Sequence, residues 1–123
     1  RLVATAVPAS HAKARRLAAR GIEVWSLPAR KPGAVDLDRL LRELARAGVA
    51  SLMVEGGGET HWGFFRAGLV DRVAAFLAPR VLAGDRARGS VGGKGFALAE
   101  TPRLSDARTE WVGEDLLVTG RLA

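Results

Sequence analysis

The stretch Ser51-Leu-Met-Val-Glu-Gly-Gly-Gly-Glu-Thr-His-Trp-Gly-Phe-Phe65 decides how the fold is interpreted. It begins inside an apolar run over residues 49–54, which predicts a central strand covered on both faces. Three glycines follow at positions 56–58, and the apolar spacing beyond them predicts a helix to about residue 68. Such a corner can seat a phosphate, because glycine lets a ligand approach the backbone and the helix start presents unpaired N–H groups. A plain tight turn between strand and helix is the alternative.

Strands and helices are expected to alternate around this corner. The pattern predicts further strands at residues 2–6, 22–26 and 70–78, and helices at 12–20 and from the N-cap Asp36 to Gly48. Residues 108–112 and 116–122 read as a closing hairpin. This order predicts an α/β fold with a mixed, mostly parallel sheet flanked by helices and an antiparallel C-terminal hairpin.

The composition limits the class of protein. A chain of 123 residues fits one domain, so residues 1–123 are interpreted as a single domain. It contains no cysteine, which excludes disulfides and thiolate metal sites and favours a reducing compartment. No pattern of histidines or carboxylates marks a metal site, so we expect no bound metal. We expect no membrane partner and a cytoplasmic location, because no apolar run approaches the roughly 20 residues of a membrane span.

The positive charge is concentrated in the first part of the chain. Residues 1–48 carry ten basic and four acidic side chains, whereas residues 49–123 carry nine of each. This excess favours an anionic ligand such as a phosphorylated nucleotide. A solvated arginine-rich surface would give the same count. Nucleic acid is not expected as a partner, because no series of aromatic side chains accompanies the basic residues.

Several side chains near the glycines are candidates for ligand contacts. Glu55 ends the predicted central strand, where ligands of α/β sheets bind, and its carboxylate can accept hydrogen bonds from a substrate. Thr60 can offer a hydroxyl and backbone donors to a phosphate, and Glu59 suits the helix dipole. No catalytic triad and no Walker motif is present, so a phosphate seat of this kind indicates a cofactor that brings the chemistry, such as a nicotinamide.

Four segments together resemble one known family. The chain is similar to the reductase domain of the bifunctional riboflavin-biosynthesis deaminase/reductase over most of its length, and the segments that carry the likeness are Val54-Glu-Gly-Gly-Gly58, Ala67-Gly-Leu-Val-Asp71, Phe76-Leu-Ala-Pro-Arg-Val-Leu-Ala-Gly84 and Val112-Gly-Glu-Asp-Leu116. The ordered pair of a glycine corner and Ala-Gly-Leu-Val-Asp is its most specific part.

The resemblance implies a fold similar to dihydrofolate reductase and an enzyme that reduces 5-amino-6-(5-phosphoribosylamino)uracil with NADPH. The phosphorylated pyrimidine is then the substrate, and its ribosyl group opens to a ribityl chain. Carried over by motif, Glu55 would contact the substrate, and the residues along NADPH would be Gly57, Gly58, Glu59, Thr60, His61, Trp62 and Gly63. The resemblance names no catalytic residue.

The sequence begins at Arg1 and not at methionine. By the resemblance, a further strand and helix region would precede it and complete the site, so we expect this chain alone to be an incomplete, inactive reductase site that needs that N-terminal portion. Uncovered strand edges make a homodimer plausible. The alternatives are another dihydrofolate-reductase-like NADPH oxidoreductase and a nucleotide-binding or dimerisation module without catalysis.

Overall fold

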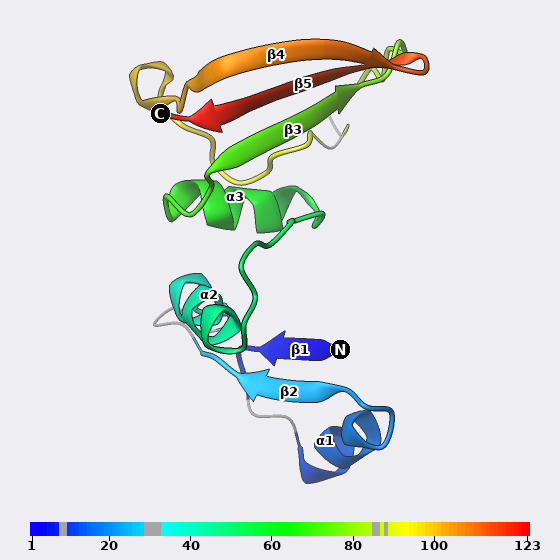
Figure 1. The fold of residues 1–123 in the computed structure, drawn as a ribbon, viewed down its shortest axis with the longest axis vertical. Coiled ribbons are helices and arrows are strands. Elements are labelled where there is room, and N and C mark those ends of the chain that lie inside the picture. The colour runs from blue at the N-terminus through cyan, green and yellow to red at the C-terminus, as the bar shows by residue number, and fades with distance from the viewer. Residues whose placement is uncertain (8–9, 29–32, 85–86, 88) are drawn as a thin grey trace. The chain divides into compact units, whose positions relative to one another are not determined.

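The computed structural model describes residues 1–7, 10–28, 33–84, 87 and 89–123. The chain divides into two compact units, Arg1–Met53 and Val54–Ala123, which are described separately. The prediction of a single domain stays a prediction. The mixed α/β class is confirmed, since one unit holds a parallel two-stranded sheet and the other an antiparallel three-stranded sheet (Figure 1).

The first unit is built from a strand–helix–strand crossover. β1 (Leu2–Thr5) and β2 (Glu23–Ser26) pair in parallel, and α1 (His11–Ala18) connects them and packs against β2. Ser10 caps α1 as the sequence predicts, since its hydroxyl accepts a hydrogen bond from the Lys13 amide at 3.3 Å. The three elements form close to their predicted positions.

A second helix follows β2 in the same unit. α2 (Leu37–Arg46) begins where the sequence predicts, because Oδ1 of its N-cap Asp36 accepts the Arg39 amide at 2.9 Å. The backbone amide of Asp36 itself donates to Leu27 O at 2.9 Å. Leu27 is buried to 3% exposure and is the core residue of this unit among those described.

The second unit places one helix beside an antiparallel sheet. Figure 1 shows α3 (Gly58–Arg66) drawn next to β3 of a sheet with strand order β3-β5-β4, and Phe64 on this helix is buried to 5% exposure. The remaining elements are β3 (Arg72–Leu77), the short 3₁₀ helix η1 (Leu98–Glu100), β4 (Leu104–Val112) and β5 (Asp115–Leu122).

The predicted C-terminal hairpin is confirmed and is longer than predicted. Val112 pairs with Asp115, which leaves a two-residue turn that starts at Gly113 with φ +63°. Glycine at that place fits a type II′ turn, whose twist matches that of the flanking strands. The register shifts between Ser105 and Arg108, where Asp106 has φ +51°, so a bulge divides the long strand β4.

The prediction of a central strand at residues 49–54 is wrong. This segment forms no regular secondary structure, and Met53 is 81% exposed and Leu52 46% exposed. A strand exists only where a neighbour pairs with its backbone, and none of the strands in the described part of the chain does so here. The described strands make one parallel pairing, in the β1-β2 sheet, and two antiparallel pairings, in the β3-β5-β4 sheet. The strands are therefore not mostly parallel, in contrast to the prediction from the sequence.

No helix in the described ranges has the length and apolar character needed to cross a membrane. Where in the cell the protein works stays a prediction.

Candidate functional site

The start of α3 lacks a side-chain cap. Its N-cap is Gly57, with φ −73° and ψ 172°, and glycine has no side chain to accept a first-turn amide. The amides of Thr60 and His61 donate to Gly57 O at 2.9 and 3.1 Å. The Thr60 amide is therefore engaged in the helix turn, contrary to the expectation that it serves a ligand. Within the described residues the amides of Gly58 and Glu59 have no backbone acceptor.

The three glycines of the corner have different surroundings. A Cβ built on Gly56 would lie 2.7 Å from Cβ of Thr60, and one on Gly58 would lie 2.8 Å from the backbone nitrogen of Gly92. A Cβ on Gly57 would meet nothing within 4 Å. The helix start is therefore closed by the protein at Gly56 and Gly58 and open at Gly57.

A loop distant in sequence lies against this helix start. Gly92 N donates to Gly58 O at 2.9 Å, and Gly93 N donates to Oε1 of Glu59 at 3.0 Å. The sequence predicts Glu59 as a partner of the helix dipole, but the structure gives its carboxylate a specific donor 34 positions away.

His61 contacts the same loop. Its ring is half-buried, with Nδ1 2.7 Å from Ser90 O and Nε2 3.2 Å from Val54 O. Because a neutral imidazole carries one N–H, it can donate to only one of these carbonyls, whereas the imidazolium donates to both. The side chain of His61 is thus directed at the protein backbone on both sides.

Trp62 packs on the continuation of that loop. Its ring meets Phe96 edge to face, with centroids 4.9 Å apart and planes at 62°. A Cβ on Gly93 would lie 2.1 Å from the Trp62 ring, so the tryptophan lies directly over this glycine. Trp62 has a packing role within the second unit, whatever else it contacts.

The other two candidates have few contacts. Glu55 is exposed and follows a segment without ladder partners, so it does not stand at the end of a strand as the sequence predicts. Gly63 is half-buried inside α3, where its carbonyl accepts the Ala67 amide at 3.2 Å.

Reasoning from the sequence missed residues 89–93 as a part of this site. The adjacent glycines Gly92 and Gly93 were the available signal, since consecutive glycines outside a hairpin indicate a close backbone approach. The sequence pattern does not indicate which helix or strand Gly92 and Gly93 approach.

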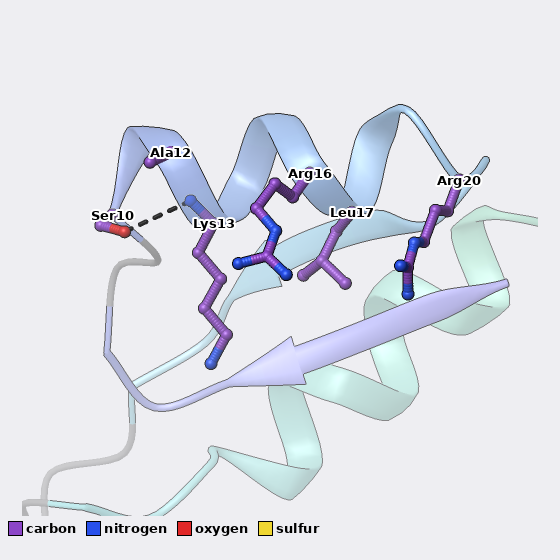
Figure 2. Close-up of a pocket in the computed structure, with 6 residues that line it drawn as sticks. All are labelled: Ser10, Ala12, Lys13, Arg16, Leu17 and Arg20. Atoms are coloured by element: carbon purple, nitrogen blue, oxygen red, sulfur yellow. Dashed lines mark hydrogen bonds between the residues drawn. The ribbon is translucent and has the colours of Figure 1, made fainter.

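Two surface hollows are lined by residues other than those of the glycine corner. One of about 350 Å³ lies on α1, where Figure 2 shows the side chains of Lys13, Arg16, Leu17 and Arg20 projecting from the same side of the helix. Its three cations belong to the basic first part of the chain, so the hollow suits an anion better than an apolar ligand. A second hollow, of about 300 Å³, lies on the hairpin and is lined by Arg108, Thr109, Glu110 and Thr119.

Known proteins share this sequence pattern. The family model described as "RibD C-terminal domain" matches residues 1–118. The "2,5-diamino-6-ribosylamino-4(3H)-pyrimidinone 5′-phosphate reductase" of Methanothermobacter thermautotrophicus is 40% identical over 85 residues, which cover 68% of this chain and 39% of that protein. The "Riboflavin biosynthesis protein RibD" of Actinobacillus pleuropneumoniae is 33% identical over 99 residues, which cover 80% of this chain and 26% of that protein.

Solved structures share the fold. Acinetobacter baumannii RibD superposes with a TM-score of 0.77 at 20% identity, over 99% of this chain and 31% of that one. A pyrimidine reductase-like protein from Corynebacterium diphtheriae superposes with a TM-score of 0.70 at 15% identity. The superposition covers 99% of this chain and 49% of that one. The chain therefore spans between about a quarter and two fifths of the curated relatives named above. Because the family match runs over residues 1–118, the chain belongs to the RibD C-terminal domain family.

Proposed function

We propose that this chain is the reductase portion of an enzyme of riboflavin biosynthesis, which uses NADPH to convert a phosphorylated ribosylaminopyrimidine into its ribityl product. The family match and the relatives that are named reductases support this proposal. A reductase of this kind needs a nucleotide cofactor as its electron donor, and NADPH is the donor that we propose.

The observation that carries the proposal is the open helix start at Gly57. The amides of Gly58 and Glu59 point from an uncapped helix, and the positive end of the helix dipole adds to their attraction for an anion. Since a Cβ at Gly57 would meet nothing, a phosphate oxygen can reach these donors from that side. The residues present therefore fit the phosphate part of NADPH.

The chain's own groups would bind and orient the reactants. When bound, NADPH supplies the hydride that turns the ribosyl group into a ribityl chain. The Gly58 and Glu59 amides would hold phosphate oxygens, and the exposed carboxylate of Glu55 would accept a hydrogen bond from a pyrimidine N–H or a substrate hydroxyl. Holding both partners in one geometry lowers the entropic part of the barrier.

The other assigned residues complete this proposal. Thr60, with its exposed side chain, and Gly63, inside α3, would lie along the same cofactor. His61 and Trp62 would support that surface, since their rings also contact the loop. An N-terminal portion of the same protein and a second copy of the chain would supply the remainder of the site and cover the strand edges.

The sequence resemblance implies one candidate substrate, and the printed name of a relative supplies a second. One is 5-amino-6-(5-phosphoribosylamino)uracil, and the other carries a 2-amino group in place of the 2-oxo group, as in the reductase from Methanothermobacter thermautotrophicus. The higher identity to that reductase, 40% against 33%, favours including the diamino compound. Turnover of each compound by the purified protein at its natural length, followed by NADPH absorbance, distinguishes them.

The first test is a titration with NADPH, using NADH as the control and the fluorescence of the three tryptophans as the readout. Saturable quenching with a preference for NADPH supports the seat. Loss of turnover in Glu55→Gln with retained NADPH binding supports the substrate role of Glu55. Binding without turnover of either pyrimidine favours an oxidoreductase of other specificity, and no binding favours a module without catalysis.

A further inference from the structure

The segment of residues 89–93, here called the clasp loop, closes one side of the α3 start. Two of its backbone amides donate to Gly58 O and to the Glu59 carboxylate, 34 positions away in sequence, so these bonds depend on tertiary folding and not on the helix alone. The Glu59 side chain is exposed, and its Oε1 accepts the Gly93 amide.

The approach of this loop leaves little room for side chains. A Cβ on Gly92 would lie 2.8 Å from Oε1 of Glu59 and 3.2 Å from the Glu59 backbone nitrogen. At Gly92 the end of the Glu59 side chain can shift to make room, but a Cβ on Gly58 would lie 2.8 Å from the Gly92 backbone nitrogen, so the loop and the helix start fit together only while position 58 carries glycine. The clasp loop therefore shares a boundary with one of the two amides assigned to the phosphate.

His61, two residues after Glu59 on α3, also contacts the clasp loop. Its Nδ1 is 2.7 Å from Ser90 O, and its other ring nitrogen faces the Val54 carbonyl, just before the glycine corner. One side chain thus links the segment that enters the corner with the loop that covers it. Glu59 and His61 together contact the loop at both of its ends.

We propose that Glu59 and His61 are positioning residues, which hold the clasp loop as a wall of the cofactor seat and leave Gly57 as its open side. This inference rests on the proposed function, because a wall matters only if the α3 start receives the phosphate of NADPH. It assigns the two side chains to the protein's own backbone, and not to the cofactor as the family resemblance implies.

Substitutions at Glu59 separate this role from a simple effect of charge near the helix dipole. A dipole role requires a negative charge, so Asp would serve and Gln would not. The clasp requires an oxygen that reaches the Gly93 amide, so Gln would serve, and Asp, one methylene shorter, would not. Glu59→Gln and Glu59→Asp therefore give opposite results under the two roles.

Hydrogen exchange at the Gly93 amide tests the clasp without any ligand. In the purified protein at its natural length, we expect exchange to be about threefold to tenfold faster in Glu59→Asp and near the wild-type rate in Glu59→Gln. His61→Ala is the second variant, and it should speed exchange across the loop. Glu114→Gln and Glu114→Asp, in the exposed turn of the hairpin, are matched controls that should change nothing.

Titration with NADPH tests whether the clasp loop is a wall of the seat. We expect the Kd for NADPH to rise about threefold to tenfold in Glu59→Asp. In Glu59→Gln it should stay near the wild-type value. Unchanged Gly93 exchange in Glu59→Asp overturns the clasp. Faster exchange with an unchanged Kd overturns its role as a wall. No NADPH binding by the wild-type protein overturns the proposed function and the wall with it, whereas the exchange result still decides whether the clasp exists.

Discussion

The helices α2 and α3 both begin after an extended N-cap residue, but their N-caps carry different side chains. Both N-caps have φ −73°, yet Asp36 accepts a first-turn amide with its own carboxylate and Gly57 has no side chain to do so. At α2 the Asp36 carboxylate accepts the third amide of the helix, that of Arg39, and places a negative charge at the helix start. At α3 the N-cap brings neither a charge nor a side chain, the Gly57 side is open, and a loop distant in sequence lies against Gly58 and Glu59. Under the proposed function, the start of α2 serves stability and the start of α3 serves a ligand, and substitutions at the two helix starts test that division.

The largest effect is expected at the loop that encloses α3. In Gly93→Ala, the new Cβ would overlap the Trp62 ring at 2.1 Å, and the residue has φ +74°, so the free energy of unfolding should fall by about 2–3 kcal/mol. Urea denaturation measures this. Gly95→Ala is the matched control, because it has a similar φ of +72° with nothing within 4 Å of its Cβ. Equal losses in the two variants would show that backbone strain alone is responsible.

The second effect concerns the open side of α3. Gly57→Ser gives α3 the kind of cap that α2 has, so the unfolding free energy should rise by a few tenths of a kcal/mol. The affinity for NADPH should fall about tenfold, because the hydroxyl satisfies a donor and occupies the open side. Isothermal titration and urea denaturation of the same sample measure both. Asp36→Ser, which keeps a cap on α2, should leave the affinity unchanged. An affinity retained in Gly57→Ser would place the phosphate elsewhere.

The third effect concerns the capped helix. Asp36→Ala removes the acceptor of the Arg39 amide and should cost about 1 kcal/mol of unfolding free energy. Thermal or urea unfolding measures the loss, and Asp36→Asn should recover most of it because the amide oxygen can still accept. NADPH affinity should be the same in all three proteins. A change in affinity would contradict the assignment of α2 to stability alone.

The smallest effect lies on the surface of α2. Asp38 and Arg42 form an ion pair one turn apart, and both side chains are 59% exposed. Arg42→Ala should therefore reduce the unfolding free energy by only about 0.3–0.5 kcal/mol at low salt. Repeating the denaturation in 1 M salt should remove most of the difference. A loss above about 1 kcal/mol that survives salt would indicate a packing role for the arginine stem.

Local chemistry explains which parts of the fold the sequence predicts. Ser10 and Asp36 cap their helices as expected, because a cap needs only a side-chain oxygen and an amide three residues away. The turn after Val112 is equally local, and glycine at position 113 allows its positive φ. The helix after the glycine corner begins at Gly58, in agreement with the apolar spacing.

Long-range pairing explains what the sequence leaves undetermined. Residues 49–54 are apolar enough for a strand, but whether they form one depends on a neighbour that their own pattern does not specify. The roles of Glu59 and His61 likewise depend on a loop about thirty positions away. At the site, the sequence located the glycine corner but could not identify which glycines face the protein and which faces solvent.

The unequal surroundings of the three glycines bear on how this chain can diverge. A substitution at 56 conflicts with the Thr60 side chain and one at 58 with the backbone of residues 89–92, so both act on the protein's own contacts, whatever molecule the protein binds. A substitution at 57 adds atoms where no protein atom lies within 4 Å, so the folded chain can tolerate it while its ligand changes. Position 57 is therefore the point in this corner at which a descendant can acquire a different specificity in one mutational step.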